Sequence, residues 1–360
     1  MIATCQGRVE KILKKEGHKT EILVEVEGKS GKAVNYDRLT GNVDIGDMVV
    51  LNTTAVDLNL GSGGYHFVIS NLNQVEHQLT QGGHIMKLRY TPFQLKVFAA
   101  EEQESQHHDV FNNFESLQGM PVIIGTLHSM LAPVVEILKH HKPDIKIAYI
   151  MTDGAALPID FSNVVNQLKD MGKIHGTITI GNAFGGDLDC VTIYNGLIAA
   201  KDILHCDIAV VTMGPGIAGT GTTYGFTGIE QGHIIDAVND LGGTAIAVPR
   251  VSFKDPRERH QGISHHSITV LGKICKTKAW IGIPDFDEEK NNYIHGQVLK
   301  GHLNSKHEIL RISGEGILEV LDSSTIRMTT MGRGLTMEKE FFITCGAAAV
   351  VGIKILNDHQ

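Results

Sequence analysis

Between residues 121 and 284 the sequence alternates short, almost wholly apolar runs with longer segments that repeat apolar residues at helical spacing. Strands that are apolar on both faces need cover on both, which is typical of a buried parallel sheet. The intervening segments, such as SMLAPVVEILKHH and SITVLGKICK, supply the helices that cover it. The sequence therefore predicts an α/β fold, with a mainly parallel sheet and helices on both faces. Its expected strands are PVIIGTLH, IKIAYIMTDG, HGTITIGN, DIAVVTMG, TAIAVPR and AWIGIP.

Two Thr-x-x-Gln/Glu patterns predict helix starts. Thr91-Pro92-Phe93-Gln94 is a capping box with proline at the first helical position, so a helix is expected to begin there. Thr227-Gly228-Ile229-Glu230 has the same spacing ahead of an apolar, helix-periodic run, and Thr227 is expected to cap that helix.

Residues 1–72 contain only short runs of β-forming residues separated by glycine and asparagine turns, which predicts a small β-barrel of the OB-like or SH3-like kind. Residues 73–360 are then a Rossmann-like α/β domain. The barrel segment carries eight Lys/Arg against nine Asp/Glu, and the whole chain has a net charge of −8. That balance argues against a nucleic-acid binder, so a lid or assembly module is expected.

The compartment is expected to be the cytoplasm. The first residues, MIATCQGRVEKILKK, lack the apolar core of a secretory signal. The uncharged run from Phe341 to Ile353 is shorter than the roughly 18 apolar residues of a membrane span and is interpreted as a buried helix. This helix and the barrel are possible interfaces, so a homo-oligomer is expected. The cysteines are dispersed, which fits reduced thiols: Cys5, Cys190, Cys206, Cys275 and Cys345.

Ligands of open α/β sheets bind beyond the carboxyl ends of the strands, so the residues that follow each expected strand are the candidates for a site. Nearly every such exit is polar or glycine-rich, which favours a pocket over structural loops. The exits are His128 and Ser129; Thr152, Asp153 and Gly154; Asn182 and Gly185–Asp187; Gly214–Tyr224; and Arg250–Ser267.

The glycine-rich exit at 213–225 is the most distinctive segment. Its backbone amides could cradle an anion, with the next helix adding its positive end. The segment contains G-x-G-x-x-G, which raises a dinucleotide interpretation, but Pro215 removes an amide and about ten residues separate Gly214 from the helix. A purely structural crossover remains open. The predicted ligand-binding residues here are Gly214, Gly216, Gly219, Thr220, Gly221 and Thr222.

The exit at 250–267 carries four basic side chains in an acidic protein. Guanidiniums bind carboxylates and phosphates with paired hydrogen bonds, so Arg250, Arg257 and Arg259 are predicted to bind an anion, together with Asn182 from another exit. The alternative for Arg257 and Asp255 is an exposed salt bridge of a loop.

Histidines of the same segment could move protons. His260 or His265 is the predicted general base, oriented by Asp153 or Asp255. His265 and His266 are adjacent in a predicted helix, so only one of them is expected to point into the site. A metal site from His128, Asp153, His260 and one of this pair is conceivable, but no ligand spacing demands it, and no metal is predicted. Ser264 and Ser267 are expected to cap the following helix. Cys190 and Cys206 lack basic neighbours in the sequence and are interpreted as core residues.

Several long segments resemble a bacterial family catalogued as domain of unknown function 3866. The resemblance spans the chain and implies that these segments are family hallmarks, which favours them as elements of the site; it assigns no activity and no catalytic role. They are GSGGYHF (61–67), GGHIMKLRYTPFQ (82–94), TMGPGIAGTGTTYGFTGIE (212–230) and RVSFKDPRERHQGISHHS (250–267).

Three functions are compatible with these patterns. The leading hypothesis is an enzyme, or an enzyme-derived protein, that binds a small anionic molecule, phosphorylated or nucleotide-like. The second is a non-catalytic metabolite sensor or assembly protein, in which the barrel reports that the site is occupied. The third is an NAD(P)-dependent oxidoreductase, where Arg250 would suit a 2′-phosphate. No cofactor is specified by the sequence.

Overall fold

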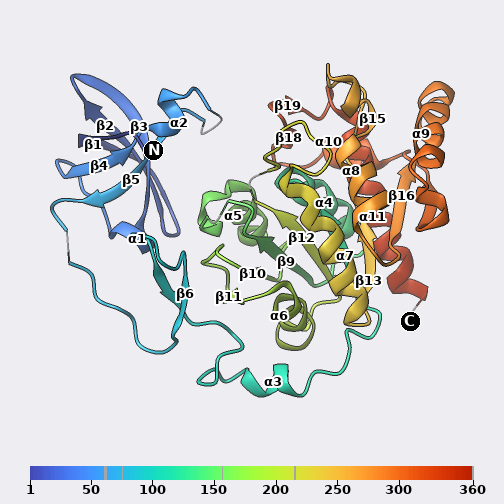
Figure 1. The fold of residues 1–360 in the computed structure, drawn as a ribbon, viewed down its shortest axis with the longest axis horizontal. Helices are drawn as coiled ribbons and strands as arrows, with labels where there is room; N and C mark the ends of the chain where they lie inside the picture. Colours follow the sequence, from blue (N-terminus) through green and yellow to red (C-terminus); the bar gives the residue numbers. More distant parts are fainter. Residues whose placement is uncertain (61–62, 75, 156, 215, 359–360) are drawn as a thin grey trace. The chain divides into compact units, whose positions relative to one another are not determined.

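A computed structural model describes residues 1–60, 63–74, 76–155, 157–214 and 216–358 of the chain (Figure 1). Pro215 of the glycine-rich exit and residues 61–62 of the GSGGYHF segment lie outside this part. The chain divides into two compact units. The first comprises Met1–Lys96 and Asp160–Asn163, and the second comprises Val97–Ile159 and Val164–Gln360.

The first unit is built on a closed five-stranded barrel, which confirms the barrel predicted from the sequence. The strands close in the order β1-β2-β3-β5-β4; β3 and β5 pair in parallel and the other pairs are antiparallel. Register shifts within the long β1 let it bend and pair with both β2 and β4. The elements are β1 (Thr4–Glu16), β2 (Lys19–Val26), β3 (Lys29–Tyr36), α1 (Asp37–Thr40), β4 (Met48–Asn52), α2 (Thr54–Asp57) and β5 (Tyr65–Asn71).

The helix expected at Thr91 is absent, and this prediction was wrong. β6 (Ile85–Lys87) and β7 (Leu95–Val97) form a two-stranded sheet, with a turn between them. In that turn the Thr91 hydroxyl donates to the carbonyl of Leu88 at 2.8 Å and accepts from the amide of Phe93 at 3.2 Å. Threonine makes such local bonds in turns as readily as at helix starts, so the pattern alone does not create a helix.

The second unit contains an eight-stranded sheet in the order β11-β10-β9-β12-β8-β13-β16-β17. Every neighbouring pair is parallel, as the apolar strand pattern predicted. The strands are β8 (Pro121–Gly125), β9 (Ile147–Thr152), β10 (Gly176–Thr179), β11 (Leu188–Asp189), β12 (Ile208–Met213), β13 (Thr244–Ala247), β16 (Trp280–Pro284) and β17 (Glu308–Ile312).

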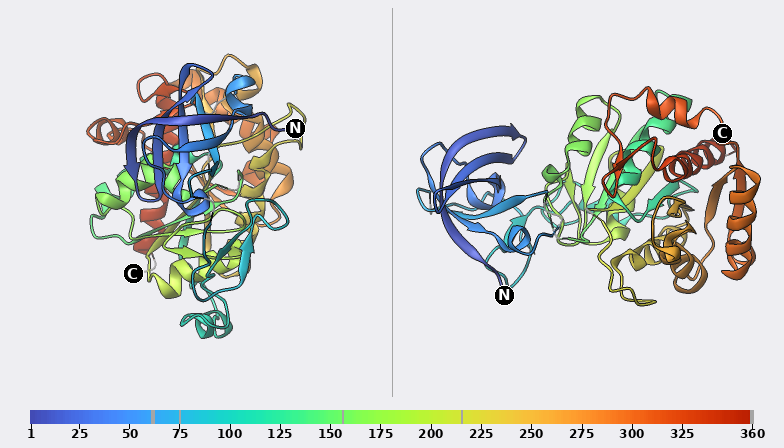
Figure 2. Two further views of the ribbon diagram at one scale, coloured as in Figure 1. Left: turned by 90° about the vertical axis from the view of Figure 1, so that its left-hand side faces the viewer. Right: turned by 90° about the horizontal axis from the view of Figure 1, so that it is seen from above.

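Helices cover both faces of this sheet (Figures 1 and 2). One face packs against α4 (Leu131–His141), α5 (Asn163–Asp170), α10 (Ile317–Asp322) and α11 (Lys339–Asp358). The other packs against α6 (Ile193–Ile198), α7 (Glu230–Asp240), α8 (His265–Thr269) and α9 (Glu288–Lys300). π-helical turns at Ala199–Ile203 and Val270–Ile274 extend α6 and α8, and the short α3 (His108–Asn112) lies ahead of β8.

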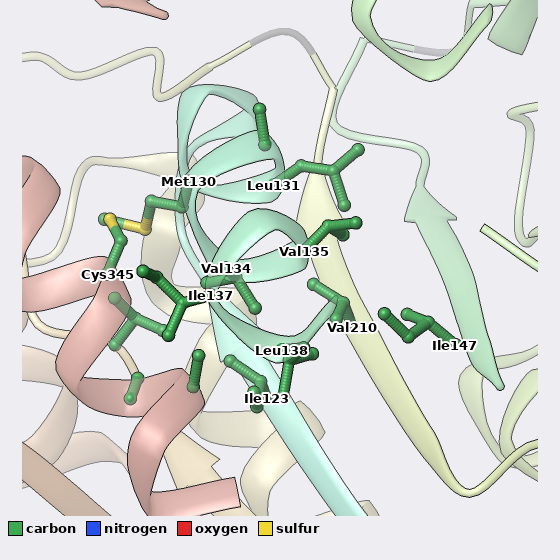
Figure 3. Packing of buried hydrophobic residues seen from close by; sticks show 14 of the residues in the cluster. Ile123, Met130, Leu131, Val134, Val135, Ile137, Leu138, Ile147, Val210 and Cys345 are labelled. Carbon is green, nitrogen blue, oxygen red and sulfur yellow. The ribbon is translucent and has the colours of Figure 1, made fainter. Parts of the chain in front are cut away.

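Helix α4 joins the sheet to α11 (Figure 3). Ile137 of α4 and Met130, which directly precedes the helix, point toward α11, where Cys345 lies, while Val135 and Leu138 of α4 point toward the sheet. Among the described residues, α11 is the single helix with the length and apolarity that a membrane span needs, and it is mostly buried in the fold. The sequence prediction of a buried helix is confirmed.

Neighbouring strands in the middle of this sheet send their connections to opposite faces, and β8 and β12 are one such pair. β8 and β12 are neighbours, but β8 leads through α4 on one face and β12 leads through α7 on the other. Where adjacent parallel strands send their connections to opposite faces, the loops diverge and leave room at the carboxyl ends. The fold therefore opens a site between the exits of β8 and β12.

Candidate functional site

A cavity of about 490 Å³ lies at these carboxyl ends. Residues that follow β8, β12 and β13 line it, together with the segment 327–331 from far downstream in the chain. The lining residues are Leu127, His128, Ser129, Ala132, Val164, Gly216, Ile217, Gly219, Gly221, Arg250, Arg257, Arg259, His260, His266, Arg327, Met328, Thr329, Thr330 and Met331.

The cavity lining carries one sign of charge. Four arginines contribute to it, and none of the described lining residues is an aspartate or glutamate. The chain as a whole has a net charge of −8, so this is a local concentration of positive charge in an acidic protein. Such a concave site raises the local concentration of anions.

Two of these arginines, Arg250 and Arg257, bind one buried carboxylate in a hairpin that begins directly after Arg250. β14 (Val251–Ser252) and β15 (Gly262–Ile263) pair antiparallel. The loop between them contains Asp255, whose carboxylate is buried. Asp255 accepts hydrogen bonds from Nη2 of Arg250 at 2.8 Å and from Nε and Nη2 of Arg257 at 2.9 and 2.8 Å. The bonds from Arg257, and then those from Arg250, hold the pKa of Asp255 far below its usual range. Asp255 is thus an ionised anchor for the two guanidiniums.

One nitrogen of Arg250 is left without a partner. The residue is 6% exposed, its Nη2 is bonded to Asp255, and its Nη1 is buried with no hydrogen-bond partner in the part of the chain that the structure describes. Its side chain lines the cavity. A buried charged donor without an acceptor costs free energy, so this nitrogen marks a place where a ligand acceptor would bind.

A second carboxylate braces the hairpin from the C-terminal part of the chain. Ser252 donates to Oε2 of the buried Glu338 at 2.8 Å, and Arg333 bonds to Oε1 of Glu338 at 2.5 Å. Arg333 lies on β19 (Arg333–Gly334), which forms a hairpin with β18 (Thr329–Thr330). The residues of β18 line one wall of the cavity. These bonds tie the arginine loop to the segment that carries Arg327.

The glycine-rich exit folds into a loop that closes on itself. Gly219 forms an antiparallel bridge with Phe226, and the amide of Thr220 donates to the carbonyl of Gly225 at 2.8 Å. The Thr227 hydroxyl accepts from the amide of Ala218 at 3.1 Å, so it does not cap α7 as the sequence pattern suggested. A helix that starts only after such a loop differs from the tight strand-to-helix turn of a dinucleotide site. Gly216, Gly219 and Gly221 still line the cavity.

Three histidines meet at the start of α8. The ring centroids of His265 and His266 are 4.1 Å apart, and that of His260 lies 4.9 and 5.2 Å from them. Of the adjacent pair, His266 lines the cavity and His265 does not, although the two rings lie against each other. Side chains in a first helical turn lean toward the N-terminus, where no preceding turn separates them. His260 lines the cavity together with His266.

Local contacts fix the rings of this cluster. The Ser264 hydroxyl caps α8 by accepting from the amide of His266 at 3.3 Å and lies 2.8 Å from Nδ1 of His260. Phe226 of the glycine-rich loop stacks on His266 with ring centroids 4.1 Å apart. Burial, followed by nearby positive groups, lowers the pKa of His260 to about 3 and that of His266 to about 4. The rings are therefore neutral at pH 7.

A chain of buried hydroxyl groups connects to His128 in the cavity lining. Nδ1 of His128 lies 3.1 Å from the hydroxyl of Tyr149, which lies 3.0 Å from Oγ1 of Thr212. Burial lowers the pKa of His128 to about 4 and raises that of Tyr149 above its ordinary value. His128 is thus a neutral imidazole with a fixed orientation.

Asp153 and Asn182 form a separate polar group after β9 and β10. Asp153 accepts from the amide and the side chain of Asn182 at 3.0 and 3.2 Å. Beside it, Thr152 donates to Glu230 at 2.7 Å; burial and the nearby Asp153 raise the pKa of Glu230 to about 7. None of these four residues lines the cavity. Asp153 therefore orients Asn182, and no hydrogen bond from it to a histidine is present among the described contacts.

The structure brings together part of the residue set predicted from the sequence. Those that line the cavity are Gly216, Gly219, Gly221, Arg250, Arg257, Arg259 and His260. Those that do not line it are Gly214, Thr220, Thr222, Asp153, Asn182, Asp255 and His265. Asp255 and His265 nevertheless contact the lining, through the arginines and His266.

The segment 327–331 of the lining was not predicted from the sequence. It follows none of the expected strands, so the candidates at strand ends did not include Arg327, Met328, Thr329, Thr330 and Met331. The hydroxyls of Ser129 and Thr330 are 3.1 Å apart, which joins this segment to the exit of β8. A basic residue beside two threonines is too common a pattern to identify such a wall in advance.

The fold and this cavity define a parallel α/β protein whose chain begins with a small closed barrel. The model of the family described as "Protein of unknown function (DUF3866)" matches residues 32–349, nearly all of the sequence, so the chain belongs to this family. No curated protein matches it.

Proposed function

We propose that this protein binds a small phosphorylated or nucleotide-like molecule in the cavity and acts on it as an enzyme, or derives from an enzyme that did. The observation that carries the proposal is the unpartnered Nη1 of Arg250, buried in a lining with four arginines and no carboxylate among its described members. An anionic group at this nitrogen satisfies its missing hydrogen bond and offsets its charge.

The arrangement favours phosphate over a single carboxylate. Guanidiniums bind phosphate oxygens with paired, charge-assisted hydrogen bonds, and a phosphate offers more acceptor oxygens than one carboxylate. Arg257 and Arg259 come from one loop, while Arg327 comes from another part of the lining. A volume of about 490 Å³ is in the range of small-molecule sites and leaves space for more than the anionic group itself.

The chemistry of the remaining lining residues suits them to two further roles. Hydroxyls of Ser129, Thr329 and Thr330 supply donors and acceptors for the uncharged part of the ligand. His128 is the ring with a fixed orientation, through Tyr149, and is the group assigned to move a proton. We place this function in the cytoplasm, since the five cysteines are dispersed along the sequence without a C-x-x-C pair, as is typical of reduced thiols.

The test is anion-dependent stabilisation of the purified protein. Sodium phosphate, pyrophosphate and AMP should each raise the melting temperature beyond sodium chloride at equal ionic strength. Arg259→Ala and Arg327→Ala should each weaken binding about tenfold or more, because each removes charge-assisted hydrogen bonds worth about 1.5–3 kcal/mol. Arg311→Ala is the matched control, since Arg311 lies on β17 and does not line the cavity.

Two results would contradict the proposal. One is stabilisation by all three anions that is no greater than by chloride, and the other is an equal loss of binding in the control. Turnover separates an enzyme from a sensor: small molecules released from the denatured protein are identified by mass spectrometry and returned to fresh protein. A ligand that comes back chemically unchanged favours the sensor.

A further inference from the structure

The histidine cluster at the start of α8 has the chemistry of a metal site. His260, His265 and His266 each offer a ring nitrogen, and these three atoms all lie within 4.8 Å of one another. In a tetrahedral site with ligands about 2.1 Å from the metal, nitrogens are about 3.4 Å apart. A small rotation of the rings therefore brings the three nitrogens around one ion.

A second observation singles out the same point. Nε2 of His265 is buried and has no hydrogen-bond partner among the residues that the structure describes. A buried polar atom of this kind is normally satisfied, so its lack of a partner calls for a group that the protein chain does not supply. A neutral imidazole nitrogen presents a lone pair, which a metal cation accepts.

Contacts around the cluster resemble the outer shell of a metal site. Ligand histidines commonly use their other ring nitrogen for a hydrogen bond that fixes orientation and tautomer. Nδ1 of His260 meets the Ser264 hydroxyl at 2.8 Å, which leaves its Nε2 for a metal. Phe226 stacks on His266 and limits rotation of that ring.

We propose that His260, His265 and His266 bind one divalent transition metal ion of the zinc class. Three imidazoles and one open position are the ligand arrangement of catalytic zinc sites. The open position faces the cavity, because His260 and His266 line it. The fourth ligand is then water or an oxygen of the anion bound there.

The arginines bear on this site through charge. A metal cation beside Arg250, Arg257 and Arg259 is repelled unless an anion offsets the charge. Metal and anion should therefore bind with positive coupling, each raising the affinity of the other by the same factor. This second part of the inference rests on the proposed anion site, whereas the metal ligands do not.

The experiment is a titration of the chelator-treated full-length protein with Co²⁺. Tetrahedral Co²⁺ gives visible d–d absorption, and we expect saturation at one ion per chain. His260→Ala, His265→Ala and His266→Ala should each weaken binding more than about a hundredfold, beyond the effect of outer-shell changes. His233→Ala, an exposed histidine on α7, is the matched control. Fluorescence of Trp280, the sole tryptophan, checks that each variant is folded.

Absence of Co²⁺ binding by the unaltered protein would overturn the metal site. So would binding that survives unchanged in the folded His265→Ala and His266→Ala variants. The titration is then repeated with sodium phosphate, which should raise Co²⁺ affinity about tenfold if coupling is of ordinary size. If phosphate leaves the Co²⁺ affinity unchanged, the coupling is overturned and the metal site is not. Binding of phosphate without metal is measured separately, by the melting-temperature test of the proposed function.

Discussion

The carboxylate of Asp255 accepts a hydrogen bond of 2.8 Å from Nη2 of Arg250, and both residues are buried. Because Asp255 occupies one side of the guanidinium, the other terminal nitrogen is buried and has no hydrogen-bond partner among the described residues. One ion pair thereby holds the arginine in place and keeps part of its binding capacity for a ligand. The same carboxylate also orients Arg257, which binds it through both Nε and Nη2.

Asp255→Asn should destabilise the protein by about 3–5 kcal/mol, because it leaves the buried charge of Arg250 without its counter-charge. Chemical denaturation at pH 7 measures the change. Glu308→Gln removes half of the exposed Lys278–Glu308 pair, whose side chains are 50% or more exposed, and should cost less than about 1 kcal/mol. Equal effects of the two substitutions would show that Asp255 has no special role as an anchor.

Asp255 also predicts a dependence of stability on acid pH. Its folded-state pKa lies below the ordinary value of 3.8, so the native state keeps the carboxylate ionised where the unfolded chain takes up a proton. The stability it contributes is present above the unfolded pKa and is lost as the pH falls below it. Asp255→Asn should lack this part of the acid dependence when both proteins are denatured at a series of pH values.

Glu230 predicts a dependence of the opposite sign. Burial raises its pKa from 4.5 to about 7, so between these values the native state holds a proton that the unfolded chain has released. The free energy of unfolding should fall as the pH rises from 4.5 to 7, by up to roughly 3 kcal/mol, and then level off. Glu230→Gln should remove this slope and be the more stable protein at pH 8. Parallel pH profiles for the two proteins would refute the assignment.

Substitutions at two glycines distinguish the effect of close contact between elements on stability from the effect of helix propensity. A Cβ on Gly282 of β16 would lie 2.8 Å from the carbonyl oxygen of Ala347 in α11, so Gly282→Ala should destabilise the protein by about 1–3 kcal/mol. Gly296 is inside α9 with nothing within 4 Å of its added Cβ, so Gly296→Ala should stabilise by about 0.5–1 kcal/mol. Urea denaturation gives both values, and two effects of the same sign would contradict this account of how α11 meets the sheet.

Ser264→Ala tests whether the histidine cluster is held by its cap. The substitution should lower stability by about 1 kcal/mol, as loss of a helix cap does, and lower Co²⁺ affinity about 10–100-fold by freeing His260. Thr192→Ala removes the cap of α6, where the hydroxyl accepts from the amide of Asn195 at 3.3 Å. It should cost similar stability and leave Co²⁺ titration unchanged. A drop in Co²⁺ affinity in both variants would assign the effect to general loosening.

Much of the fold could be predicted from local pattern. Strands that are apolar throughout imply a parallel sheet covered on both faces, and short β runs with glycine turns imply a barrel; both are present. The capping patterns at Thr91 and Thr227 were misleading, because threonine hydroxyls bond to nearby backbone in turns as well as at helix starts. Short polar motifs therefore predicted less than long apolar ones.

The amino-acid sequence alone determined the barrel strands, the apolar strands and long helices of the second unit, which residues stand at the carboxyl ends of those strands, and where positive charge gathers, because these follow from side-chain periodicity and composition. Tertiary structure decided which exits share a cavity. The exits of β8, β12 and β13 meet because these strands are neighbours, while Asp153 and Asn182 leave β9 and β10 farther along the sheet. Arg327 lies beside these three exits because a segment far downstream in the sequence folds back to the cavity. Strand order and such long-range returns are set by packing of the whole core, which no local pattern records.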